Sequence, residues 1–241
     1  MTRLSVNINK IATLRNARGE NTPDVEQAAI NIEKFGAEGI TVHPRPDGRH
    51  IRYDDVRQLK KLVKTEFNIE GNPEESFRDL IMEVVPDQVT LVPDGHDAIT
   101  SNYGWDTIAN KEFLTQMCDL FHTKGIRVSI FIDPVPQMAR AAKDCGADRV
   151  ELYTAAYAKF FPIMNHDYAI GPYVATAKAA REYGLEVNAG HDLNLDNLSF
   201  FLKNIPWIKE VSIGHALICD ALYMGLENTV KAYLEKTHVN K

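Results

Sequence analysis

Histidine and glutamate side chains follow or end short apolar segments at His43, Glu70, Glu151, His191 and His215. An imidazole exchanges a proton near neutral pH, and a buried carboxyl with a raised pKa can do the same. A single histidine of this kind is more often structural than catalytic. If several meet in one place, however, they indicate general acid and base chemistry, with His43 and Glu70 as bases and His191 as an acid.

These side chains meet only if the segments that carry them end at the same edge of a sheet. Helical segments alternate with short strands along the whole chain, and glycine ends the helix before a strand at Gly36, Gly125, Gly146 and Gly184. The strands are too far apart for hairpins, which favours βα units and a parallel sheet. Eight such units predict a closed (β/α)8 TIM barrel with extra helices, formed by a single domain over residues 1–241. No G-x-G-x-x-G run follows the first strand, which weakens a dinucleotide-binding alternative.

The expected elements follow from the apolar periodicity and the glycine and proline positions. We expect strands at 4–8, 40–42, 67–70, 88–92, 126–133, 148–152, 185–188 and 210–213. We expect helices at 23–34, 53–65, 75–85, 111–124, 135–145, 173–183, 196–203 and 217–236. Two connections are longer than a barrel needs: 93–110, which we expect to act as a lid, and the aromatic segment 155–172. The second forms either an extra helix over the barrel mouth or a contact with another subunit, and we favour the subunit contact.

The last two strand ends carry a second signal. The segments 188–192 and 213–216 are turns of small residues that lead into helices. In this fold the loops after strands seven and eight commonly hold a phosphate with backbone N–H groups and a helix N-terminus. Five further residues together supply more positive charge than one phosphate requires: Lys10, Arg18, Arg45, Arg49 and His50. We therefore expect a second anionic group in the ligands.

Composition excludes several classes of partner. The net charge of −6 and the pI near 5.8 argue against nucleic acid or an anionic membrane surface as the main partner. The three cysteines lack metal-ligand spacing and are typical of reduced, packed thiols. Neither a signal peptide nor an 18-residue apolar run is present in the sequence, so we expect a cytoplasmic protein.

Four segments together resemble the pyridoxine 5′-phosphate synthase family: 6–19, 40–51, 187–191 and 213–216. The resemblance extends over essentially the whole chain. It implies a (β/α)8 barrel with added helices that assembles as a homo-octamer. It also implies condensation of two small phosphorylated substrates, 1-deoxy-D-xylulose 5-phosphate and 3-amino-2-oxopropyl phosphate, to pyridoxine 5′-phosphate, with release of phosphate and water and without a metal or organic cofactor.

The resemblance also assigns roles to residues. His43 and Glu70 would accept protons, His191 would donate one, and Glu151 matches a polar active-site position. The amino-ketone phosphate would contact Asn7, Arg18, Asp192, Gly214 and His215. The pentulose phosphate would contact Asn9, Lys10, Arg45, His50 and Thr100. Because the amine and the ketone that condense both belong to substrates, the reaction requires repeated proton transfers but no enzyme lysine.

The chain departs from the family pattern at two places. Asn9 and Lys10 stand where the family often has Asp-His, so the resemblance carries no acid or base role over to them, although both side chains can hydrogen-bond. Asp192 stands where we expect a glycine, and a carboxylate beside a phosphate is repulsive. We therefore expect Asp192 to contribute only its backbone N–H, with its side chain turned away or capping the next helix.

Two other functions fit the same residues. A metal-dependent isomerase or epimerase of phosphorylated sugars would use the histidines with Glu70 and Glu151 as ligands, although the sequence has no H-x-H or H-E-x-x-H pair. A barrel that binds a phosphometabolite without catalysis is the third hypothesis. A Schiff-base aldolase is not expected, because Lys10 is the one lysine at an interior strand end.

Overall fold

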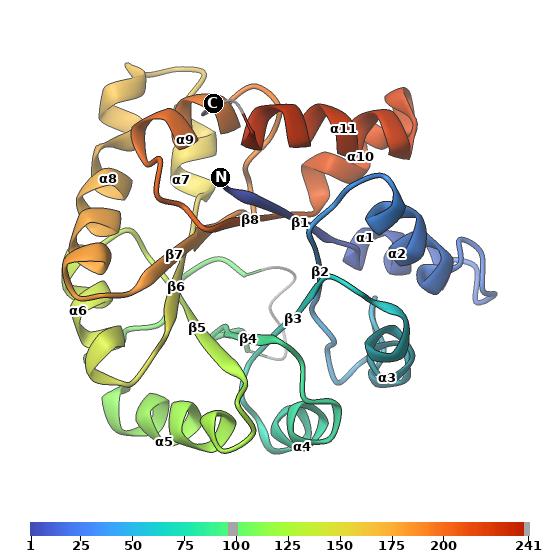
Figure 1. Ribbon diagram of the computed structural model, residues 1–241, viewed down its shortest axis with the longest axis horizontal. Coiled ribbons are helices and arrows are strands. Elements are labelled where there is room, and N and C mark those ends of the chain that lie inside the picture. Colours follow the sequence, from blue (N-terminus) through green and yellow to red (C-terminus); the bar gives the residue numbers. More distant parts are fainter. Residues whose placement is uncertain (96–100, 239–241) are drawn as a thin grey trace.

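The computed structural model describes residues 1–95 and 101–238 and shows a closed barrel of parallel strands inside a ring of helices (Figure 1). Each strand pairs with the next in the chain, and β8 closes the barrel on β1. The strands are β1 (Arg3–Asn7), β2 (Gly39–Val42), β3 (Glu66–Gly71), β4 (Gln88–Leu91), β5 (Arg127–Ile132), β6 (Arg149–Leu152), β7 (Glu186–Ala189) and β8 (Glu210–Ile213). The predicted (β/α)8 barrel is confirmed.

Helices cover the outside of the strands, and their starts and stops follow local sequence signals. They are α1 (Asn9–Asn16), α2 (Val25–Lys34), α3 (Tyr53–Leu62), α4 (Glu75–Val84), α5 (Lys111–His122), α6 (Pro136–Asp144), α7 (Ala155–Phe160), α8 (His166–Glu182), α9 (Leu198–Asn204), α10 (His215–Met224) and α11 (Leu226–Thr237). The four glycines expected to end helices all have positive φ, from +69° at Gly125 to +110° at Gly36. Within the described ranges, no helix is long and apolar enough to cross a membrane.

Three helical regions differ from the sequence prediction. Helix α1 was not expected, because only Ile11, Ala12 and Arg15 bury a face and the segment looked like a polar loop. Helix α8 begins at His166, seven residues before the predicted start, and Pro172 lies inside it. The predicted single helix 217–236 is two helices, because Gly225 adopts φ +76° between α10 and α11.

The aromatic segment 155–172 forms α7 and the first turns of α8. Tyr157 is fully buried, and its ring packs against Tyr173 and Phe201 with centroids 5.7 and 5.1 Å away. Thus an extra helix is present, and it packs against α8 and α9. On the same segment Ile163 and Tyr168 are 72% and 78% exposed.

Polar side chains line much of the barrel interior, where most barrels of this class carry bulky apolar residues. Ser5 Oγ lies 2.7 Å from Thr41 Oγ1, and Thr90 Oγ1 donates to Asn68 Oδ1 at 3.0 Å. All four side chains are buried and come from the four consecutive strands β1 to β4. The apolar core therefore lies mainly between the strands and the helices, and includes Leu4, Ile40 and Leu91, the last residue of β4.

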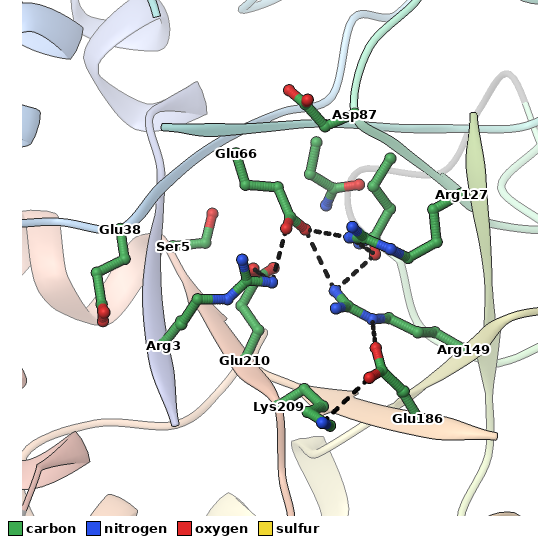
Figure 2. A network of polar contacts seen from close by, with 12 residues as sticks. Arg3, Ser5, Glu38, Glu66, Asp87, Arg127, Arg149, Glu186, Lys209 and Glu210 are labelled. Carbon is green, nitrogen blue, oxygen red and sulfur yellow. Dashed lines mark hydrogen bonds and ion pairs between the residues drawn. The ribbon is translucent and has the colours of Figure 1, made fainter. Parts of the chain in front are cut away.

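A network of ion pairs closes the end of the barrel at which the strands begin. Figure 2 shows Glu66 among three arginines: Arg3 (2.6 Å), Arg127 (2.8 Å) and Arg149 (3.2 Å). Arg149 also pairs with Glu186 at 2.7 Å. Because each of these residues is the first of its strand, parallel alignment gathers them at one end, opposite the strand ends that carry the predicted site.

Candidate active site

The predicted strand-end residues meet in one cavity at the carboxyl ends of the strands. Its volume is about 320 Å³. Twelve of the predicted site residues line it: Asn7, Asn9, Lys10, His43, Arg45, His50, Glu70, Glu151, His191, Asp192, Gly214 and His215. The convergence expected from a parallel barrel is therefore present in the structure, and the chemical role of each residue stays a prediction.

His43 and Glu70 lie side by side at the ends of β2 and β3. Nδ1 of His43 is 3.8 Å from Oε2 of Glu70. Burial, helped by the charge of Arg45, lowers the pKa of His43 well below its usual value. Burial together with the charges of Glu151 and Asp94 raises the pKa of Glu70 well above its usual value. Both groups therefore favour their uncharged forms: a neutral imidazole that can accept a proton, and a carboxyl that keeps its proton to unusually high pH.

Two asparagines from the start of the chain hold this pair in place. Asn7 Nδ2 donates to Glu70 Oε2 at 3.3 Å, and its Oδ1 accepts the N–H of Asn9 at 3.0 Å. Asn9 Oδ1 in turn accepts the backbone N–H of His43 at 2.9 Å. The unexpected helix α1 thus begins on a hydrogen-bonded chain that connects β1, β2 and β3.

Glu151 lies at the same mouth, with Oε2 buried and without a hydrogen-bond partner among the described residues. Burial raises its pKa to about 7, although the charge of His191 opposes the shift. A carboxyl with a pKa in this range can both take up and release a proton under physiological conditions.

His191 follows β7 and is bonded to its neighbour in the sequence. Its Nδ1 lies 2.7 Å from Asp192 Oδ2. Burial lowers the pKa of His191, but the hydrogen bond to Asp192 and the charges of Asp192 and Glu151 outweigh it, and the net shift is upward. Of the two orientations expected for the Asp192 side chain, capping of the next helix is wrong, because α9 has no side-chain cap and the carboxylate contacts His191. That the side chain turns away from a phosphate stays a prediction.

The backbone of Asp192 also has a partner in the chain. Its N–H donates to Thr154 Oγ1 at 3.2 Å. The sequence predicts that this N–H contacts a phosphate, and that contact would require a shared or exchanged hydrogen bond. The start of α10 is different: Gly214 and His215 stand at its N-terminus beside Asn7, where helix N–H groups suit an anion.

Arg45 is buried and paired with Asp94, which sequence reasoning had seen only as part of a turn. The Arg45 Nη2 to Asp94 Oδ2 distance is 2.5 Å, and Ser101 Oγ donates to the same oxygen at 2.7 Å. Arg45 Nε and Asp94 Oδ1 have no hydrogen-bond partner in the described part of the chain. The signal that could have identified Asp94 is its position shortly after β4, with only Val92 and Pro93 between Leu91 and Asp94.

His50 reaches the cavity as a neutral group. Burial and the charges of Arg45, Lys10 and Arg49 lower its pKa to about 4. Its Nδ1 accepts the backbone N–H of Ile51 at 3.0 Å, so the ring proton is on Nε2. His50 can therefore give a ligand a hydrogen bond but no positive charge.

Some predicted residues lie elsewhere. Arg18 is exposed after α1 and does not line the cavity. Arg49 pairs with Asp47 at 2.6 Å and lines a neighbouring cavity of about 470 Å³, which shares His43 and Arg45 with the first. Thr100 lies outside the described residues. Sequence reasoning missed several lining residues that a strict alternation along the strands would have indicated: Thr90, Val92, Phe131 and Ser212.

The connection after β4, expected to act as a lid, is fixed along its second half. Trp105 N–H donates to the Phe131 carbonyl at 2.8 Å, and Thr107 Oγ1 donates to the Met138 carbonyl at 2.8 Å. Gly104 packs so closely on the backbone of Ile132 that any side chain would overlap it. The lid function stays a prediction. Across residues 1–95 and 101–238, no three or more His, Cys, Asp or Glu side chains form a group that could hold a metal ion.

Comparison with known sequences identifies relatives over the whole chain. The model of the family described as "Pyridoxal phosphate biosynthesis protein PdxJ" matches residues 4–239. The pyridoxine 5′-phosphate synthase of Cytophaga hutchinsonii is 62% identical over 236 residues, which cover 98% of this chain and 99% of the relative. The enzyme of the same name from Flavobacterium johnsoniae is 60% identical, with the same coverage.

Solved structures share the fold at low sequence identity. The 3-keto-L-gulonate-6-phosphate decarboxylase of Vibrio cholerae has a TM-score of 0.67 at 12% identity and covers 98% of this chain and 97% of its own. A phosphoribosylanthranilate isomerase of Thermotoga maritima has a TM-score of 0.59 at 14% identity, with 98% of both chains covered. These similarities show the barrel fold alone.

Proposed function

The chain belongs to the family of the pyridoxal phosphate biosynthesis protein PdxJ, and we propose that the cavity around His43, Glu70 and His191 is its catalytic site. Relatives about 60% identical over nearly their full length are pyridoxine 5′-phosphate synthases, and this chain carries out the same reaction. In this proposal it condenses 1-deoxy-D-xylulose 5-phosphate with 3-amino-2-oxopropyl phosphate and releases phosphate and water.

One observation carries the assignment of the site: proton-exchanging groups with opposite pKa shifts converge in a single cavity. Formation of an imine between the amine of one substrate and the ketone of the other, loss of water and ring closure all need protons added to oxygen and removed from carbon or nitrogen. His43, neutral because of its lowered pKa, is suited to accept a proton. His191, with its raised pKa, is suited to donate one.

The two glutamates extend this set of groups. Glu70 has a pKa well above the usual value, so once it loses its proton it is a stronger base than an ordinary carboxylate. Glu151, with a pKa of about 7, can exchange protons in either direction. The reaction needs several successive proton transfers, and the cavity provides acceptors and donors for them.

Anionic groups of the substrates have two sets of partners. Lys10 and Arg45 supply positive charge, and His50 supplies a hydrogen-bond donor. The N-terminus of α10 at Gly214 and His215 supplies backbone donors beside Asn7. These two groups fit the two phosphate esters of the proposed substrates.

We propose further that the protein is a homo-octamer in the cytoplasm. Among the exposed large apolar side chains, Phe160, Ile163, Met164 and Tyr168 lie on α7, on α8 and between these helices, and Leu222 and Tyr223 lie near the end of α10. Contiguous exposed apolar surface is typical of subunit contacts. Sedimentation velocity of the purified protein measures the assembly directly, and a monomer would contradict this proposal.

The function is tested with purified protein that has been treated with a chelator and given both substrates. We expect the ultraviolet absorbance of a pyridoxine ring and one released phosphate for each ring formed. Omission of either substrate should abolish both signals. Folded protein that forms no ring, or that requires added metal, would contradict the proposal and direct attention to isomerisation of phosphorylated sugars.

A further inference from the structure

Asp192 and His191 form a hydrogen-bonded pair inside the cavity, with Asp192 Oδ2 2.7 Å from His191 Nδ1. Resting on the function proposed above, we propose that Asp192 is a positioning residue for His191. It fixes the imidazole through Nδ1, so that Nε2 is the nitrogen that exchanges a proton with the substrate. Asp192 thus affects the reaction through His191 and does not itself contact the reacting atoms.

Hydrogen bonds hold the turn that carries the pair. Thr154, fully buried at the end of β6, donates its hydroxyl to the Gly190 carbonyl at 2.9 Å and accepts the Asp192 N–H at 3.2 Å. The Leu193 N–H closes the turn on the same Gly190 carbonyl at 2.7 Å. With the backbone held on both sides of His191, the side chain of Asp192 has a defined direction, and its carboxylate lies on the imidazole.

Other charged and polar groups surround His191, but they stand in different relations to it. Glu151 on β6 and Asp94 after β4 act on His191 through charge. Tyr153 presents its ring edge-on, with the centroids 5.8 Å apart, and His43 interacts electrostatically with His191. The Asp192 carboxylate lies at hydrogen-bond distance from Nδ1 of His191, and this hydrogen bond is the leading contribution that raises the pKa of His191. A carboxylate bonded to one imidazole nitrogen fixes the tautomer and stabilises the protonated ring.

The competing explanation is that Asp192 contacts the substrate itself, for example the ammonium group of the amino-ketone phosphate. The two explanations predict different kinetics. A positioning residue changes kcat and the pH at which His191 loses its proton. A substrate ligand changes KM for the amino-ketone and leaves that pH in place.

The test compares Asp192→Asn and Asp192→Ala with wild type, and uses Asp196→Asn as the matched control on the exposed turn before α9. For Asp192→Asn we expect the alkaline limb of the kcat profile to move down by about one pH unit, with kcat about tenfold lower on that limb. For Asp192→Ala we expect a larger decrease in kcat, because this change also removes the hydrogen-bond acceptor for Nδ1 of His191. In both Asp192 variants, KM for each substrate should stay unchanged. The pH profile of kcat for Asp196→Asn should match that of wild type.

A second measurement does not depend on activity. In protein labelled with [13Cε1]histidine, the His191 resonance is assigned by its loss in His191→Gln and then titrated without substrate. A lower His191 pKa in Asp192→Asn supports the pair even if the proposed reaction is not observed. An unchanged His191 titration, or a raised amino-ketone KM with an unchanged kcat profile, would overturn the inference.

Discussion

Nδ1 of His43 and Oε2 of Glu70 lie 3.8 Å apart, and burial shifts the pKa values of the two groups in opposite directions. A protonated histidine beside an ionised glutamate would be the usual ion pair. Here the shifts favour a neutral imidazole and a protonated carboxyl, so the one proton of the pair is held by Glu70. In the proposed reaction, His43 would therefore be the acceptor available at the start of a cycle, and Glu70 would become an acceptor after it has released its proton.

The variant Glu70→Gln tests whether Glu70 transfers a proton in the reaction. The amide keeps the shape of the side chain and an acceptor for Asn7, but it cannot exchange a proton. We expect kcat to fall roughly 10²- to 10⁴-fold with little change in KM for either substrate. Steady-state kinetics with each substrate varied in turn measures this, and Glu75→Gln on the exposed face of α4 is the control. A wild-type kcat in Glu70→Gln would exclude proton transfer by this residue.

The buried pair of Arg45 and Asp94 should be important for stability. Removal of one partner leaves a buried charge without compensation, so Asp94→Ala should lower the free energy of unfolding by about 3–5 kcal/mol. Asp94→Asn should cost less, because it still accepts from Ser101. Urea unfolding measures both variants. Glu227→Gln removes an exposed ion pair with Lys231 on α11 and should leave stability unchanged, whereas an equal loss in all three variants would contradict the assignment.

Glu210 makes stability depend on pH. Burial and the charge of Glu66 raise its pKa to about 8, although Arg149 opposes the shift and Arg3 Nη2 lies 3.3 Å from Oε2. The proton bound in the folded state stabilises it fully below the unfolded pKa near 4.5, and this contribution is lost as pH rises through about 8. We therefore expect the free energy of unfolding of Glu210→Gln to rise relative to that of wild type between pH 5 and 8, by on the order of a few kcal/mol. Unfolding by urea at a series of pH values measures this difference.

Glu186 in the same network provides the opposite control. Burial raises its pKa, but its hydrogen bond and ion pair with Arg149 outweigh this and give a net decrease. Its stabilising contribution is present above its unfolded pKa and is lost as pH falls through the folded value. Glu186→Gln should therefore be less stable than wild type at neutral pH. If the stabilities of Glu210→Gln and Glu186→Gln at neutral pH differed from wild type in the same direction, this description of the network would be wrong.

Gly190 allows β7 to approach β8 next to the site. A Cβ at this position would overlap the carbonyl oxygen of Ser212, which is a backbone atom and cannot rotate aside as a flexible side chain would. We expect Gly190→Ala to lower both the urea midpoint and kcat, because the turn that carries His191 must move. Gly171→Ala is the matched control: it lies on exposed α8 with open space around it and should be neutral or stabilising by about 0.5–1 kcal/mol. Equal behaviour of the two variants would contradict this explanation.

Local signals were sufficient to predict the strands and most helices. Positive φ at Gly36, Gly125, Gly146 and Gly184 requires only the residue itself, and each of these glycines ends a helix as expected. Propensity failed where packing decided the outcome. Pro172 suggested a boundary, yet α8 continues through it because Ala169, Ile170 and Tyr173 bury one continuous face.

The sequence by itself determined which strand ends carry His43, Glu70, Glu151 and His191, because a parallel barrel brings all such ends to one mouth. Only the tertiary structure decided what each side chain contacts there. Arg45 donates a hydrogen bond to Asp94, although 49 positions separate them in the sequence. Arg18 does not line the cavity. Asp192, predicted to turn away from a phosphate or to cap the next helix, bonds to His191, and Thr154 from another βα unit holds the backbone N–H of Asp192. Strand order specifies the edge at which a residue lies, but the partner of its side chain depends on loops from distant units that pack together.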